Sequence, residues 1–160
     1  MLIMKLIVDS REPYWVKEKF KDLSDEVNDL KVEIETLPAG DFKTNKFIIE
    51  RKTLDDFISS FTTTTERKDG SEYERLPEQL DKLKHEDKSL MKMFLIIGEN
   101  YRDAFSNINP HSINGVLAKL TALGFNVVMM SNSNDWIDYI YRLCRMYDKY
   151  TLPSDQSELI

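Results

Sequence analysis

Short apolar runs along this chain alternate with stretches in which polar and apolar residues are mixed. Leu2–Val8 is almost continuously apolar, which predicts a central strand covered on both faces. Lys92–Ile97 predicts another buried strand, and Phe125–Met130 a further one. Val32–Leu37 alternates Val, Ile and Leu with Glu and Thr, a pattern typical of a half-exposed strand.

Turn residues follow this half-exposed strand. Pro38-Ala39-Gly40 predicts a turn, and Phe42–Thr44 and Phe47–Ile49 flank Thr44-Asn45-Lys46 as the two arms of a hairpin. Thr53 then predicts the cap of a helix, because its hydroxyl can accept a hydrogen bond from a free backbone N–H of the first turn.

Five segments have the residue pattern of helices: Tyr14–Leu23, Thr53–Phe61, Tyr73–His85, Ser112–Leu123 and Asn134–Tyr150. Residues 62–72 hold four consecutive threonines, a charge cluster and Asp69-Gly70, which predict a mobile loop. The segment 153–160 predicts a disordered tail, so residues 1–152 form the expected domain.

Strands that alternate with helices predict an α/β fold with a mixed central β-sheet flanked by α-helices. The chain has no GxGxxG and no Walker-type loop, so nothing in it favours nucleotide binding. A length of 160 residues fits one domain with a proper core.

Composition narrows the setting of this domain. No run approaches the roughly 18 apolar residues that span a bilayer, so we expect no membrane partner. The single cysteine, Cys144, excludes an internal disulfide and a cysteine zinc site, and it agrees with an intracellular location in cytoplasm, nucleoid or nucleus. The net charge of −6 argues against tight stand-alone binding to nucleic acid, because phosphates are bound mainly by Lys and Arg.

The stretch with the clearest chemistry is Gly40-Asp41, eight residues, then Glu50-Arg51-Lys52. In a strand, Glu50 and Lys52 point to the same side, and a tight hairpin brings Asp41 beside them. Carboxylates suit Mg²⁺, which lowers the pKa of a water that can attack a phosphodiester. Lys52 can orient that water, deprotonate it, or stabilise charge on the phosphate, and the sequence leaves these roles open.

A second acidic pair follows the first predicted strand, in Asp9-Ser10-Arg11-Glu12. Asp9 and Glu12 can complete the shell of the first metal ion or hold a second one. The alternative for each motif alone is structural: a Glu-x-Lys pair is usually an exposed strand face, and Asp9 can simply end a strand in a turn.

The joint pattern resembles the nuclease domain of the XPF family of structure-specific endonucleases, members of the PD-(D/E)xK superfamily. It consists of Val8–Glu12, then Gly40-Asp41, then Glu50–Asp56, the family signature being Gly-Asp, a spacer, Glu-Arg-Lys, three residues and Asp. The similarity continues through Asp69-Gly70, Arg75, Gln79, Ile97-Gly98-Glu99 and His111–Gly115, and covers about residues 2–150.

The resemblance implies a restriction-endonuclease-like fold, dependence on Mg²⁺ or Mn²⁺, and cleavage of branched DNA such as flaps, forks or junctions in DNA repair or recombination. It implies Asp41, Glu50 and Asp9 as metal ligands, with Glu12 beside them in the catalytic set, and Lys52 as the catalytic lysine. It also implies DNA contacts, which we expect from three arginines: Arg11, Arg51 and Arg75. Family members commonly carry a helix-hairpin-helix module, so such a module or another DNA-binding subunit is an expected partner.

The terminal helix carries two apolar stripes, whereas a surface helix of a monomer needs one. The first stripe is Ile137, Ile140, Tyr141 and Cys144, and the second is Trp136, Tyr139, Leu143, Met146, Tyr147 and Tyr150. The second stripe can pack under a loop, but we favour a homodimer interface centred on Leu143, Tyr147 and Tyr139, because exposed aromatic patches tend to bind partners. The family also dimerises through this part of the domain.

Three functions therefore remain in view. The first is a dimeric DNA endonuclease. The second is a non-catalytic scaffold subunit that binds DNA or a nuclease partner, although the motif acids and the lysine are all present. The third is a related nuclease acting on RNA, or a sequence-specific restriction enzyme, which the same metal site would serve.

Overall fold

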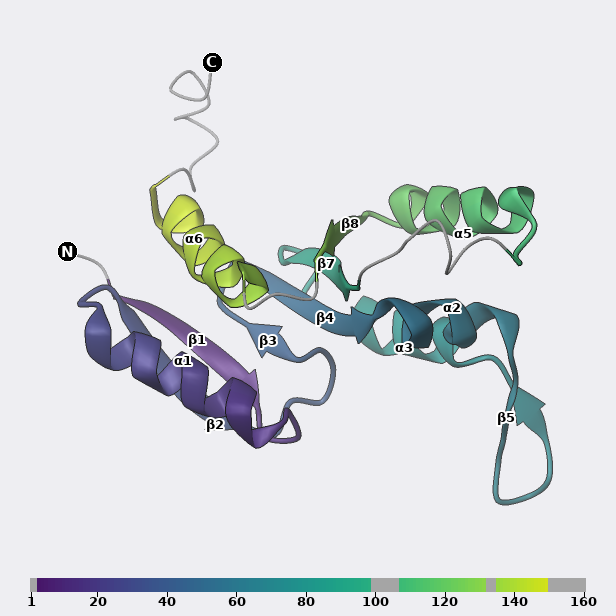
Figure 1. Cartoon of the computed structure of the whole chain (residues 1–160), viewed down its shortest axis with the longest axis horizontal. Coiled ribbons are helices and arrows are strands. Elements are labelled where there is room, and N and C mark those ends of the chain that lie inside the picture. Colours follow the sequence, from purple (N-terminus) through teal and green to yellow (C-terminus); the bar gives the residue numbers. More distant parts are fainter. Residues whose placement is uncertain (1–2, 99–106, 132–134, 150–160) are drawn as a thin grey trace, which may run out of the picture.

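A six-stranded mixed sheet forms the centre of the computed structural model, which describes residues 3–98, 107–131 and 135–149 (Figure 1). Its strands lie in the order β2-β1-β3-β4-β7-β8. They are β1 (Met4–Asp9), β2 (Leu30–Glu35), β3 (Phe42–Lys43), β4 (Phe47–Thr53), β7 (Met91–Ile97) and β8 (Phe125–Met130). Strand β2 is parallel to β1, and β4, β7 and β8 are parallel to one another. The short β3 joins the two groups, antiparallel to both β1 and β4.

Five described helices cover the sheet. Because side chains alternate between the two faces of a strand, β4 and β7 contribute to two cores, and each helix packs on one of them. On β4 and β7, Phe47, Ile49 and Leu95 pack with α1 (Tyr14–Glu26) and α6 (Asp135–Lys149). The alternate residues, among them Ile48 and Ile96, pack with α2 (Leu54–Thr62), α3 (Arg75–Lys84) and α5 (Pro110–Ala122). The predicted α/β fold with a mixed, helix-flanked sheet is confirmed.

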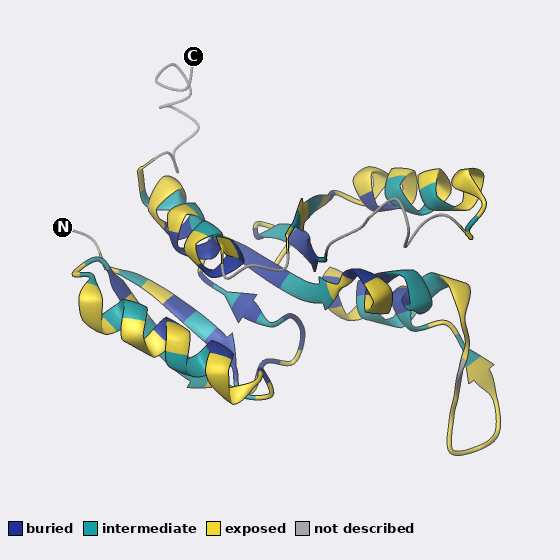
Figure 2. Cartoon of the chain, viewed as in Figure 1, coloured by how far each residue is buried: buried dark blue, intermediate teal, exposed yellow. Residues whose placement is uncertain are grey.

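Strand β1 is fully covered on one face and only partly on the other, so the prediction that both its faces are buried is wrong for the second face (Figure 2). Leu6 and Val8 are fully buried on the side of α1 and α6. On the other face Lys5 is exposed, and its Nζ lies 2.9 Å from Oε2 of Glu33 on β2. The reason is that α2, α3 and α5, the described helices on this side of the sheet, pack over β4, β7 and β8 and not over β1.

The predicted helices and the predicted hairpin are confirmed, with ends shifted by a few residues. Oγ1 of Thr53 accepts from the backbone N–H of Asp56 at 3.1 Å and caps α2 as expected. The second arm of the hairpin, β4, runs on to Thr53 and therefore includes the Glu-Arg-Lys motif.

Residues 62–72, for which we predicted a mobile loop, include a short strand pairing. They contain β5 (Thr65–Glu66) and lead to β6 (Glu72–Tyr73), an antiparallel pair that projects from the domain in Figure 1. Asp69 shapes the turn by accepting from the backbone N–H of Ser71 at 2.9 Å. Strands of two residues are too short to show the alternation from which a strand is predicted.

Helix α6 packs on its own domain through both of its apolar stripes. Trp136, from the second stripe, is 2% exposed. Tyr139, Leu143 and Tyr147 are half-buried against the same core, and the Tyr147 ring lies 5.5 Å from the Phe47 ring. The second stripe thus offers a partial surface, and the homodimer interface stays a prediction. The predicted tail, like Tyr150, lies outside the described residues, and none of the described helices is long and apolar enough to cross a membrane.

Candidate active site

The turn before β3 fixes the position of Asp41. Gly40 adopts a φ of +77°, and a Cβ at this position would lie 2.6 Å from Cγ1 of Ile48, so only glycine fits here without strain. The backbone N–H of Asp41 donates to the carbonyl of Ile49 at 2.8 Å, and its carbonyl accepts from the N–H of Asp9 at 2.8 Å. The residue therefore bridges the end of β1 and the middle of β4.

Asp41 and Glu50 form a half-buried acidic pair beside Lys52. Oδ2 of Asp41 accepts from the backbone N–H of Arg51 at 2.8 Å. Burial, together with the negative charges of Glu50 and Glu12, raises the pKa of Asp41 to about 8. Burial also raises the pKa of Glu50. These two carboxyls thus carry a desolvation penalty that a nearby positive charge would reduce.

Lys52 supplies one such charge. Its Nζ lies 3.8 Å from Oε1 of Glu50, as the shared face of the two residues on β4 predicts. Burial lowers the pKa of Lys52, while the charges of Glu50 and Asp41 oppose that shift. An ammonium group held among acids in a partly buried site is suited to stabilise charge developing on a phosphate.

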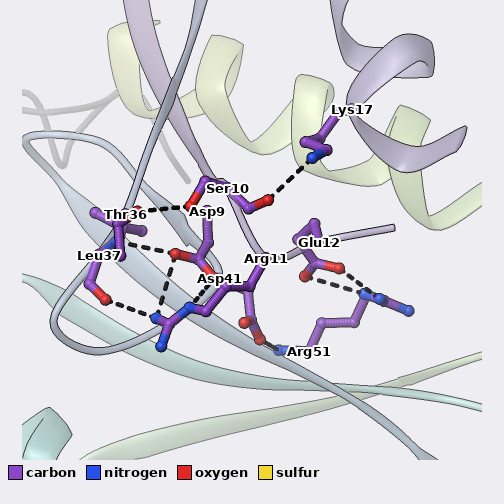
Figure 3. A network of polar contacts seen from close by, with 9 residues as sticks. All are labelled: Asp9, Ser10, Arg11, Glu12, Lys17, Thr36, Leu37, Asp41 and Arg51. Atoms are coloured by element: carbon purple, nitrogen blue, oxygen red, sulfur yellow. Dashed lines mark hydrogen bonds and ion pairs between the residues drawn. The ribbon is translucent and has the colours of Figure 1, made fainter. Parts of the chain in front are cut away.

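Asp9 lies close to this pair, but its carboxylate is already bonded (Figure 3). Oδ1 accepts from the backbone N–H of Leu37 and Oδ2 from Nε of Arg11, each at 2.9 Å. Nη2 of Arg11 also donates to the carbonyl of Leu37 at 2.7 Å. Burial by itself would raise the pKa of Asp9, but the hydrogen bonds from Arg11 and Leu37 outweigh it and lower the pKa. As built, Asp9 joins the end of β1 to the turn that precedes Asp41.

Glu12 is bonded to Arg51 in the same way. Its Oε2 accepts from Nη2 of Arg51 at 2.6 Å, and its Oε1 from Nε at 3.4 Å (Figure 3). The guanidinium carbon of Arg51 lies 5.0 Å from the ring centroid of Trp136, within the range of a cation–π contact. Arg51 thus connects the first turn of α6 to the site and, through its backbone N–H, holds Asp41. Sequence reasoning did not single out Trp136 for the site, because its spacing on the helix indicates only an apolar stripe.

These residues surround a cleft of about 380 Å³. Its lining includes Asp9, Arg11 and Glu12 from the end of β1 and the turn after it, together with Asp41 and Glu50. Helix α3 contributes Gln79, Lys82 and Leu83 to the same lining. We did not predict Lys82, although its helical spacing from Arg75 and Gln79 places all three on one face.

Of the predicted DNA contacts, only Arg11 lines the cleft with a largely exposed side chain. Arg51 also borders it, but its guanidinium is engaged by Glu12 and Trp136. Arg75 donates from Nη2 to Oγ of Ser59 and lies near enough to Lys52 that its charge adds to the lowering of the lysine pKa by burial. The structure thus brings Asp9, Glu12, Asp41, Glu50 and Lys52 together, while Tyr139, Leu143 and Tyr147 belong to the core under α6.

The carboxylates leave room for a two-residue metal site. Within residues 3–98, 107–131 and 135–149, no group of three or more His, Cys, Asp or Glu side chains is arranged to hold a metal ion. Asp41 and Glu50 nevertheless fit one, because both are oxygen donors whose raised pKa values reflect uncompensated burial. Mg²⁺ normally keeps several waters and takes only one or two carboxylates, so this pair is a sufficient set.

The ERCC4 domain family model matches residues 8–143, and the chain therefore belongs to the ERCC4 domain family. Among solved structures it is similar to XPF from Aeropyrum pernix, with a TM-score of 0.64 at 23% identity over 97% of this chain and 69% of that one. It is also similar to XPF from Aeropyrum pernix in complex with DNA, with a TM-score of 0.62 at 24% identity over 91% of this chain and 66% of that one. A comparison with curated proteins gives no match. The predicted XPF-family nuclease domain and its restriction-endonuclease-like fold are confirmed.

Proposed function

We propose that residues 1–152 form the nuclease domain of a divalent-metal-dependent endonuclease that hydrolyses DNA phosphodiester bonds at flaps, forks or junctions. The observation that carries this proposal is the half-buried pair of Asp41 and Glu50, which lines a cleft in an ERCC4-domain chain and has Lys52 3.8 Å from Glu50. The similarity to an XPF solved in complex with DNA supports DNA as the substrate. Repair and recombination are the processes that produce such branched substrates.

In this proposal Asp41 and Glu50 hold the cation, which we expect to be Mg²⁺ or Mn²⁺. When bound, it supplies positive charge and a water of lowered pKa. Lys52 donates to the phosphate oxygen on which charge accumulates. Asp9 and Glu12 do not hold the cation but position the residues that do. Asp9 fixes the turn before Asp41. Glu12 fixes Arg51, whose backbone N–H orients the Asp41 carboxylate.

A non-catalytic scaffold subunit is the second candidate, and the small ligand set favours it. Asp9, which we expected among the ligands, is bonded to Arg11 and Leu37 instead. Against a scaffold stands the desolvation of Asp41 and Glu50, which costs stability and brings no structural benefit unless a cation binds there.

Cleavage assays on a panel of labelled substrates test the proposal. The panel holds flaps, forks, junctions, linear duplex, single-stranded DNA and RNA, each with Mg²⁺, with Mn²⁺ and with EDTA. We expect metal-dependent cleavage of branched DNA that Asp41→Asn and Glu50→Gln abolish. Asp22→Asn, which removes an exposed acid of α1, serves as the matched control. Full Mg²⁺-dependent activity in Asp41→Asn would refute the site, and binding without cleavage by the wild type would favour the scaffold.

Assembly completes the proposal. We expect a homodimer through the half-buried Leu143, Tyr147 and Tyr139 of α6, and a helix-hairpin-helix or other subunit that adds affinity for DNA. The net charge of −6 supports the need for such a partner.

A further inference from the structure

One face of α3 looks into the cleft and has no role in the chemistry described above. Arg75, Gln79 and Lys82 follow one another at spacings of four and three residues, which places them on one side of the helix. Gln79 and Lys82 line the same cleft as Asp9 and Arg11. Arg75 lies one turn nearer Lys52, whose pKa its charge helps to lower.

Two side-chain atoms on this face are buried without a hydrogen-bond partner, Nε of Arg75 and Oε1 of Gln79. They are the only such atoms among the described residues. Leaving a buried polar atom unpaired costs free energy, so the unpaired amide of Gln79, a residue of the cleft lining, indicates a ligand that pairs with it. Arg75 Nε is a donor, and a side-chain amide can turn about its last bond to present either its oxygen or its N–H group.

The charges around the cleft indicate what kind of ligand fits this face. Asp9 is paired with Arg11 and Glu12 with Arg51, so these four side chains largely cancel. Of the cations that line the cleft, Lys82 alone forms no ion pair with any part of the chain that the structure describes. An unpaired cation and an amide donor in a lining whose other charges are largely neutralised are complementary to an anion that also accepts hydrogen bonds.

We propose that the Arg75, Gln79 and Lys82 face of α3 binds the phosphates of the DNA strand, and that Gln79 positions the scissile phosphate over Asp41 and Glu50. This inference rests on the proposed function, since it assigns the surface that presents the substrate to that same site. Lys82 supplies a solvent-exposed charge and Gln79 an amide donor in the cleft lining, while Arg75, which lies outside that lining, adds positive charge near Lys52. The cleft of about 380 Å³ admits the phosphate and sugar of one strand.

Binding of a fluorescent forked duplex, measured by anisotropy in Ca²⁺ over a range of salt concentrations, tests this surface. Lys82→Ala should raise the Kd several-fold and reduce the slope of log K against log salt by about 0.9, the value for one phosphate contact. Lys84→Ala removes the same charge from a neighbouring exposed position outside the cleft and should change neither quantity. Gln79→Glu keeps the shape of the side chain but places a carboxylate beside the phosphate, and should weaken binding about tenfold.

The outcomes separate this inference from the proposed function. If the wild type neither binds nor cleaves the fork, both fail. If it binds and cleaves, but Lys82→Ala behaves as Lys84→Ala and Gln79→Glu binds as the wild type does, then the α3 surface is refuted while the nuclease stands. Thermal melting of each variant shows whether a loss of binding reflects loss of the fold.

Discussion

Replacing Asp41 by Asn should stabilise the metal-free domain, although it should abolish cleavage. The folded state raises the pKa of this carboxyl from 3.8 to about 8. A carboxyl with a raised pKa opposes folding wherever it is ionised in the unfolded chain. The cost is therefore absent below pH 3.8, grows as the pH rises, and is complete above about pH 8.

The size of the effect follows from the shift. One pKa unit corresponds to about 1.4 kcal/mol, so the upper limit of the cost is about 4 kcal/mol at pH 7 and about 2 kcal/mol at pH 5. Asn keeps an oxygen that can accept from the backbone N–H of Arg51, so the hydrogen bond at 2.8 Å is retained. We expect roughly half of the upper limit, which is a rise in Tm of about 4–8 °C at pH 7.

Thermal melting in EDTA between pH 5 and pH 8 measures this difference, with Asp22→Asn as the exposed control. The gap between Asp41→Asn and the wild type should widen as the pH rises. Added Mg²⁺ should stabilise the wild type more than the variant, because a cation relieves the same penalty. A gap that is constant with pH, or a variant less stable than the wild type at pH 8, would refute the half-buried acidic pair.

The remaining predictions concern four other positions. Lys52→Ala should lower the single-turnover cleavage rate by about 10²–10³-fold with little change in DNA affinity, and a collapse of binding at an unchanged rate would instead make it a phosphate anchor. Glu12→Gln, which still accepts from Arg51, should cleave within about tenfold of wild type. Glu12→Ala should cost about 2–3 kcal/mol of unfolding free energy by urea titration, and inactive but fully stable variants would return Glu12 to the metal site. Leu143→Glu with Tyr147→Glu should yield monomers by sedimentation, unless the wild type is itself monomeric at tens of micromolar.

The α/β architecture and the assembly of the acidic site were predictable, because each depends on periodicity or on a motif. Glu50 and Lys52 share a face in any strand, and a tight turn at Gly40 necessarily brings Asp41 beside them. The partners of each charge were not predictable from the same pattern. Arg51 follows Glu50 in the sequence and was expected to contact DNA, yet it meets Glu12 from another element and Trp136 from the far end of the chain.

Which helices cover each face of the sheet was also hard to predict, because this too depends on residues distant in the sequence. The apolar run before Asp9 reads as a doubly buried strand, but which helices lie over it depends on long-range topology. The two-residue strands β5 and β6 gave no periodic signal at all. Interactions between residues distant in the sequence decide all of these features, and a single sequence records them only indirectly.

The shortness of β3 has a mechanical consequence. Two residues, Phe42 and Lys43, provide the only strand pairing between the β1–β2 half of the described sheet and the β4–β7–β8 half. The ion pair between Glu12 and Arg51 also connects these two halves, because Glu12 follows β1 and Arg51 lies on β4. The relative placement of the two halves therefore depends less on sheet hydrogen bonds than on the shared core under α1 and α6 and on this ion pair, so the spacing of the acids is set by side-chain packing.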